Sequence, residues 1–195
     1  ENNATHFLLT TGNKKIILAN RNGRAIRFNE STVRSMGRTS TGVRGMTLDE
    51  DGNDQVVGMI AVDEQPEETI MVVSEQGYGK RSEIEDYRKT NRGGKGVKTL
   101  NITDKTGKLV SIQAVTDDND LVIINKSGIT LRVSVADFRV MGRATQGVRL
   151  INLEKRNDQI GSICKVDSEP VDDELPAEGG EETASEATPE APVTE

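Results

Sequence analysis

The stretch Thr-Asn-Arg-Gly-Gly-Lys-Gly-Val-Lys, residues 90–98, places three cations around three glycines. Glycine lets the backbone turn tightly and approach another molecule closely. Lysine and arginine supply charge for an anionic partner, and arginine can bind a phosphate through two parallel hydrogen bonds. One basic glycine-containing loop is typical of an ordinary solvated turn. This stretch decides the fold because the chain contains two further versions of it.

Three turns that end in glycine, at Gly23, Gly77 and Gly128, bring these versions into register at a spacing of about 50 residues. An apolar, β-branched run precedes each turn, and glycine suits the positive φ of hairpin turns. The shared positions are an arginine four residues after the glycine, an arginine fifteen after it and a cation twenty-one after it. They are Arg27, Arg81 and Arg132; Arg38, Arg92 and Arg143; and Arg44, Lys98 and Arg149.

Each repeat reads as about four short strands, closed by an apolar run at residues 56–62, 109–115 or 160–166. No segment keeps a helical apolar period over more than about ten residues. Four strands in a unit of about 50 residues are typical of a propeller-type blade, and small sheets must stack to bury their faces. We therefore predict an all-β domain over residues 1–166, with repeats at about 16–69, 70–120 and 121–166.

Charge divides the chain at the same boundary. Of the 32 acidic residues, 11 lie from Asp167 onward, so residues 1–166 hold 25 basic against 21 acidic residues, a balance of +4. A mildly basic body with an acidic tail favours a nucleic-acid partner. Residues 167–195 have few large apolar side chains, and we predict that they form a disordered tail.

Equivalent positions in stacked blades fall on one rim, so the repeated cations are expected to form a curved track. Such a track suits the phosphate backbone of duplex DNA, which is bound without reading its sequence. The candidate DNA-binding residues are Arg38, Arg44, Arg92, Lys95, Lys98, Arg143, Arg149, Arg27, Arg81 and Arg132. The alternative is a propeller scaffold for protein partners, in which each arginine pairs with a carboxylate of the next blade.

Four motifs give the chain a resemblance to a known family. They are Gly-Lys-Arg at 79–81, Arg-Gly-Gly-Lys-Gly at 92–96, and Met-Gly-Arg at 36–38 and 141–143. With the acidic tail, they resemble the C-terminal domain of the A subunit of DNA gyrase. The resemblance implies a β-pinwheel, a propeller-like ring in which neighbouring blades exchange strands. It also implies that duplex DNA wraps around the basic outer rim.

The resemblance further implies a place in a bacterial type II topoisomerase that introduces negative supercoils. The implied partners are the B subunit of gyrase and the N-terminal region of the gyrase A chain, in an A2B2 complex in the cytoplasm, at the nucleoid and without a membrane. ATP and Mg²⁺ belong to the complete enzyme. This chain is expected to contribute no catalytic residue and to bind no cofactor or metal.

The chain departs from the family pattern in two respects. The family's wrapping sequence reads Gln-basic-Arg-Gly-Gly-Lys-Gly, whereas residues 90–96 match only its last five positions. About three blades are present, where the ring of gyrase usually has six. The C-terminal domain of topoisomerase IV, a related enzyme, is similar and remains an alternative.

Few side chains are suited to catalysis. Tyr78 follows a hairpin glycine and Tyr87 occupies an apolar repeat position, so both are interpreted as structural. The only cysteine, Cys164, lies in an apolar run and is expected in the core. The only histidine, His6, lacks the neighbours needed for a catalytic triad or a metal site.

Overall fold

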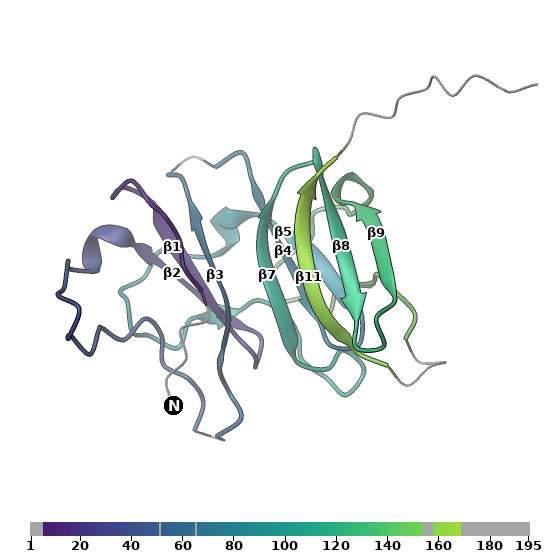
Figure 1. The fold of residues 1–195 in the computed structure, drawn as a ribbon, viewed down its shortest axis with the longest axis horizontal. Helices are drawn as coiled ribbons and strands as arrows, with labels where there is room; N and C mark the ends of the chain where they lie inside the picture. Colours follow the sequence, from purple (N-terminus) through teal and green to yellow (C-terminus); the bar gives the residue numbers. More distant parts are fainter. Residues whose placement is uncertain (1–5, 51, 65, 154–157, 169–195) are drawn as a thin grey trace, which may run out of the picture.

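The computed structural model describes residues 6–50, 52–64, 66–153 and 158–168. Figure 1 shows three twisted antiparallel sheets side by side. The first has the order β3 (Val56–Val62), β1 (Lys15–Asn20), β2 (Arg24–Asn29), β6 (Val97–Lys98). The second has the order β10 (Val148–Arg149), β5 (Tyr78–Ser82), β4 (Thr69–Ser74), β7 (Leu109–Val115).

The third sheet has the order β11 (Ile160–Asp167), β8 (Asn119–Asn125), β9 (Thr130–Ser134). After the second strand of each hairpin comes one turn of 3-10 helix: η1 (Glu30–Thr32), η2 (Ile84–Asp86) and η3 (Val135–Asp137). The three hairpins and the closing strands therefore lie where the repeat register predicts them. The all-β prediction is confirmed.

Neighbouring repeats exchange strands. β6 belongs to the second repeat by sequence but pairs with β2 of the first, and β10 of the third repeat pairs with β5 of the second. The carbonyl oxygen of the hairpin glycine anchors each exchanged segment. Gly23 accepts a hydrogen bond of 2.8 Å from the amide of Thr99, and Gly77 accepts one of 2.8 Å from the amide of Leu150. The exchange implied by the family resemblance is confirmed.

The third sheet has three strands within the described residues, whereas each of the other two has four. The reason is the exchange itself, because the fourth strand of each sheet comes from the following repeat. The corresponding segment of the first repeat, around Val43 and Arg44, forms no strand. Its partner strand would belong to a preceding repeat.

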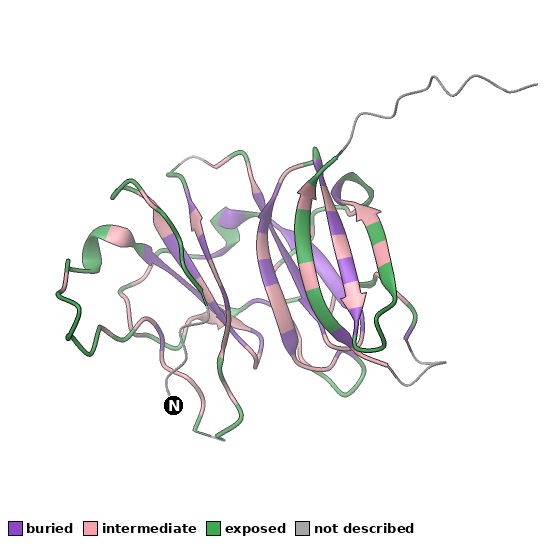
Figure 2. Ribbon diagram, in the orientation of Figure 1, coloured by how far each residue is buried: buried purple, intermediate pink, exposed green. Residues whose placement is uncertain are grey.

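The core lies between the sheets. β3 packs against β7, and β7 packs against β11. One apolar cluster joins the first two sheets through Ile17, Val72 and Ile112, and a second joins the last two through Met71, Leu121 and Ile160. Figure 2 shows the buried residues concentrated in the middle sheet, whereas β11 and β9 carry exposed stripes. Within the described part of the chain, the third sheet packs against another sheet on one side only.

This position corrects the prediction for Cys164. The cysteine lies on β11 and is exposed, because no further sheet packs against that face within the described residues. Tyr78 and Tyr87 are buried, in accordance with their structural interpretation. The predicted disordered tail falls almost wholly on residues 169–195, which lie outside the described ranges.

Replacing Tyr87 by phenylalanine is expected to lower the free energy of unfolding by about 1–2 kcal/mol. The Tyr87 hydroxyl hydrogen-bonds the hydroxyl of Thr99, and both residues are 0% exposed, so the substitution leaves a buried hydroxyl unpaired. Urea unfolding measures the change. Adding Thr99→Val should restore part of the lost stability, because it removes the hydroxyl that Tyr87→Phe leaves unpaired. Strictly additive losses in the double variant would contradict a stabilising hydrogen bond between the two hydroxyls.

Candidate nucleic-acid interface

The basic loops lie where one repeat crosses onto the sheet of the preceding repeat. Gly96 and Gly147 occupy equivalent positions just before β6 and β10, with φ angles of +73° and +83°. A Cβ atom at Gly96 would lie 2.3 Å from the carbonyl oxygen of Ala25, and one at Gly147 would lie 2.4 Å from that of Gly79. Glycine is therefore required twice over, for the left-handed backbone and for the close approach.

The arginines fifteen residues after the hairpin glycine connect neighbouring repeats. Nη1 of Arg92 donates a hydrogen bond of 2.6 Å to the carbonyl oxygen of Arg44. Nη1 of Arg143 donates one of 2.8 Å to the carbonyl oxygen of Lys98, and its Nε donates one of 2.9 Å to that of Asp86. Arg44 and Lys98 are equivalent positions. The same contact therefore recurs at both junctions between repeats, the first joining repeats one and two and the second joining repeats two and three. Each guanidinium is held in place while keeping further N–H groups for a ligand.

These contacts join the cations into one continuous surface, which we call the cationic rim. Arg44 touches Arg92, the loop of Arg92 carries Lys95 and leads to Lys98, and Lys98 touches Arg143. In the third repeat, the guanidinium carbon of Arg149 lies 5.4 Å from the centroid of the Tyr78 ring. Nε and Nη2 of Arg149 each donate a hydrogen bond to the Tyr78 hydroxyl. The members of the rim are Arg44, Arg92, Lys95, Lys98, Arg143 and Arg149, together with Arg38, which is included as the first-repeat equivalent of Arg92.

Exposure supports this grouping. Arg38, Arg44, Lys95, Lys98 and Arg149 are exposed. Arg92 and Arg143 are partly exposed, in keeping with their contacts to backbone carbonyls. Arg38 occupies the coil of the first repeat, where an equivalent contact would need a preceding blade.

The three arginines four residues after the glycine do not lie on the rim. Arg27 is 1% exposed, and its guanidinium binds the carbonyl oxygen of Ile84 at 3.1 Å and the carboxylate of Glu85 at 3.2 Å. Arg81 is 7% exposed and pairs with Asp117. Arg132 pairs with Asp120. The assignment of Arg27 and Arg81 as DNA-binding residues is corrected, because both are buried on the second hairpin strand and pair with carboxylates there. Arg132 is exposed, so only its pairing with Asp120 argues against a DNA contact.

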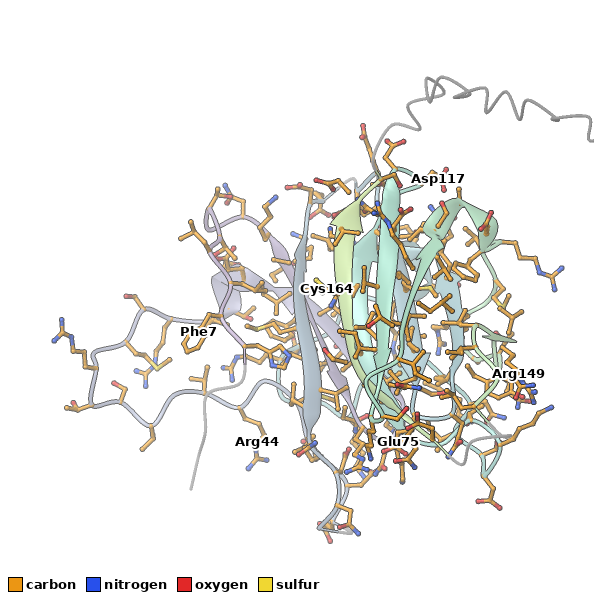
Figure 3. All side chains as sticks on the ribbon, turned by 45° about the vertical axis from the view of Figure 1, so that its right-hand side comes forward. Phe7, Arg44, Glu75, Asp117, Arg149 and Cys164 are labelled. Atoms are coloured by element: carbon orange, nitrogen blue, oxygen red, sulfur yellow. The ribbon has the colours of Figure 1, made fainter. Side chains whose placement is uncertain are left out.

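Three lysines outside the rim pair with carboxylates. Lys14 pairs with Asp63, while Lys15 and Lys89 both pair with Glu64. The hydrogen bonds from Lys15 and Lys89 lower the pKa of Glu64 to about 2. In Figure 3, Asp117 lies at the upper end of the third sheet, whereas Arg44 and Arg149 lie lower, on opposite sides of the molecule.

Among the described residues, no three His, Cys, Asp or Glu side chains are grouped as metal ligands would be. Within the same ranges, none of the helices has the length and apolar character of a membrane span.

Comparison with known proteins agrees with this architecture. The family model described as DNA gyrase C-terminal domain, beta-propeller, matches residues 14–63, 68–116 and 119–162, one segment for each repeat.

The chain belongs to the DNA gyrase C-terminal domain family.

Two curated relatives illustrate this membership. The DNA gyrase A subunit of Staphylococcus aureus (strain NCTC 8325 / PS 47) is 44% identical over 179 residues, which are 91% of this chain and 20% of the relative. The same subunit of Staphylococcus epidermidis (strain ATCC 12228 / FDA PCI 1200) is 44% identical over 161 residues, 83% of this chain and 18% of the relative. The chain thus spans about one fifth of the length of the curated relatives it matches.

Solved structures place the fold in the same family. The DNA gyrase A C-terminal domain matches with a TM-score of 0.71 and 30% identity, over 80% of this chain and 52% of that one. The C-terminal domain of DNA topoisomerase IV matches with a TM-score of 0.74 and 24% identity, over 80% and 48%. The second likeness shows the shared fold alone.

Proposed function

We propose that this chain is the DNA-binding part of the A subunit of a gyrase and that duplex DNA wraps along its cationic rim. The observation that carries the proposal is the continuity of the rim, in which the contacts of Arg92 with Arg44 and of Arg143 with Lys98 repeat at successive junctions. A track of cations neutralises phosphates without distinguishing bases. Because the blades of a beta-propeller, the fold of this family, are arranged around an axis, DNA that follows the track must bend, and added phosphate contacts repay the bending.

The relatives, which are A subunits of DNA gyrase, support a wider role for the whole protein. We propose that the full-length protein works with a B subunit in an A2B2 type II topoisomerase, in the bacterial cytoplasm at the nucleoid. In that enzyme, ATP and Mg²⁺ serve the other regions, and wrapping on this domain sets the sign of supercoiling. The role of the present chain is then to bind and bend DNA.

Replacing Lys95 by glutamine is expected to reduce the salt dependence of DNA binding. If all seven rim cations contact phosphates, a plot of log K against log salt has a slope of about −6, and loss of one contact lowers its magnitude by about 0.9. Titrating the full chain with random-sequence duplexes of equal length, over a range of salt concentrations, measures both slopes.

The matched control is Lys14→Gln, which removes the same charge from a lysine that Asp63 already neutralises. Its slope should equal that of the wild-type chain. A flat salt response of the wild-type chain would instead favour the protein-scaffold alternative. Discrimination between duplexes of different sequence would contradict binding to the backbone. Topoisomerase IV would be favoured if the full-length protein, in its complete enzyme, decatenated DNA without supercoiling it.

A further inference from the structure

A fully buried lysine lies beneath the last loop of the rim. Lys80 occupies the middle of β5 and is 0% exposed. Its Nζ donates hydrogen bonds to the carbonyl oxygens of Gly142, at 2.9 Å, and Arg143, with the Thr145 hydroxyl at 3.5 Å. All three acceptors belong to the loop 141–147, which the third repeat lays over the second sheet. One ammonium group therefore binds two backbone carbonyls and one side-chain hydroxyl of this loop.

The loop is anchored to β5 at both ends as well. The amide of Met141 donates a 2.8 Å hydrogen bond to the carbonyl oxygen of Arg81, and Gly147 packs against Gly79. Between these anchors, the Arg143 side chain reaches back to the first junction, where it binds the carbonyl oxygens of Asp86 and Lys98. The position of Arg143 on the rim thus depends on the carbonyls that Lys80 holds.

The preceding junction shows that the fold does not require a charge at this place. Ile26 holds the equivalent position on β2, is 1% exposed, and lies close to Gly94 of the loop 90–96. Burying an ammonium group is costly unless its hydrogen bonds are satisfied, whereas burying an isoleucine is favourable. A lysine at the second junction therefore indicates a role for its charge and donors beyond packing.

We propose that Lys80 is a positioning residue of the DNA-binding rim: it fixes the loop 141–147 so that Arg143 meets a phosphate, and its buried ammonium adds a second positive charge beneath that contact. The DNA-contact half of this inference rests on the proposed function, whereas the loop-fixing half stands independently.

The groups around Lys80 make this charge sensitive to pH. Burial, assisted by the positive charge of Arg143 and opposed by the carboxylate of Asp86, lowers the pKa of Lys80 to about 8. A phosphate bound at Arg143 would favour the ammonium form and raise that pKa again. DNA binding should therefore take up a proton at about pH 8–9 and weaken as the pH rises through that range.

The substitution Lys80→Met tests the proposal in the full chain, with a random-sequence duplex as the probe. At about pH 7 and about 0.1 M salt the variant should bind about eightfold more weakly, the effect of one lost phosphate contact. At about pH 9.5, where Lys80 is largely neutral in the wild type, the difference should shrink to less than about threefold. Hydrogen exchange of residues 141–147 in the free chain should be faster in the variant.

The control is Lys165→Met, which removes a lysine that donates to the carbonyl oxygen of Ala114, outside the rim. It should leave binding, its pH profile and the loop unchanged. Equal binding by Lys80→Met and the wild type, a difference that stays constant with pH, or unchanged exchange of the loop would each overturn the inference. A third outcome is that the wild type does not bind DNA, but hydrogen exchange of residues 141–147 is faster in Lys80→Met. The proposed function then fails, whereas the inference that Lys80 fixes this loop stands.

A second measurement requires no substitution and covers the case in which the methionine variant does not fold. In the wild-type chain, exchange of residues 141–147, corrected for its intrinsic dependence on pH, should accelerate between about pH 7 and 9.5 relative to residues 90–96, which lie over Ile26. Parallel profiles for the two loops would overturn the inference.

Discussion

Replacing Gly96 by alanine should lower the free energy of unfolding by about 3 kcal/mol, of which about 1–2 come from the left-handed backbone and the rest from steric overlap. The overlap is with backbone, since the new Cβ would lie 2.3 Å from the carbonyl oxygen and 2.7 Å from the carbonyl carbon of Ala25. A flexible side chain could move aside, but β2 cannot do so without weakening its pairing with β6. The expected result is partial separation of the first two sheets.

The same substitution at Gly42 provides a matched control. Gly42 is the first-repeat equivalent, with a φ of +81°, but a Cβ there would meet no atom within 4 Å. Gly42→Ala should therefore show the conformational cost alone, about 1–2 kcal/mol. Urea unfolding followed by circular dichroism compares the two variants. Equal losses would show that the close approach of the exchanged strand contributes nothing.

Replacing both Arg92 and Arg143 by glutamine should weaken DNA binding about 60-fold at about 0.1 M salt and reduce the magnitude of the salt slope by about 1.8. These two arginines lie at successive junctions and bind carbonyl oxygens of the preceding repeat. Because those bonds hold each guanidinium in place, little further side-chain entropy is lost when a phosphate binds.

The control for this pair is Lys14→Gln combined with Arg132→Gln, which lowers the net charge by the same amount. Both of these cations already pair with carboxylates, Asp63 and Asp120. The control should bind DNA within about twofold of the wild type, since a neutralised cation releases few counterions. Equally weak binding by both double variants would mean that the affinity for DNA depends on the net charge of the chain and not on the rim cations.

Much of the fold was predictable from the sequence because the same residue types recur at the same offsets. Three glycine turns in register located the hairpins, and three apolar runs located β3, β7 and β11. Periodicity does not show to which sheet a short strand belongs, and the exchange of β6 and β10 was implied only by the family resemblance. Pairing between repeats depends on which glycine carbonyl lies nearby, a property of the assembled fold.

The candidate site was predictable in part for the same reason. Arg27 and Arg92 both occupy positions that are arginine in all three repeats, so an alignment of the repeats does not distinguish them. In the structure, Arg27 is buried among carbonyl groups, whereas Arg92 lies on the rim. Arg27 lies on β2 and turns toward the second repeat, whereas Arg92 lies in the loop that crosses between repeats, a placement that the repeat alignment does not reveal. Lys80 was missed as a functional candidate because it has no basic counterpart in the other repeats. Its signals were its place in the Gly-Lys-Arg motif at 79–81 and the break in the repeat pattern, with Ile26 and Leu131 at the equivalent positions.

The exchange of strands also bears on how such a gene can lengthen or shorten. Each sheet accepts its last strand from the repeat that follows, and the accepting glycines and donated Gly-Val-basic segments are equivalent at both junctions. Duplicating one full period, wherever the break falls, therefore creates a new junction from surfaces that already fit. Duplicating part of a period leaves a donated strand without an acceptor. Evolution by tandem duplication is thus confined to whole-blade steps.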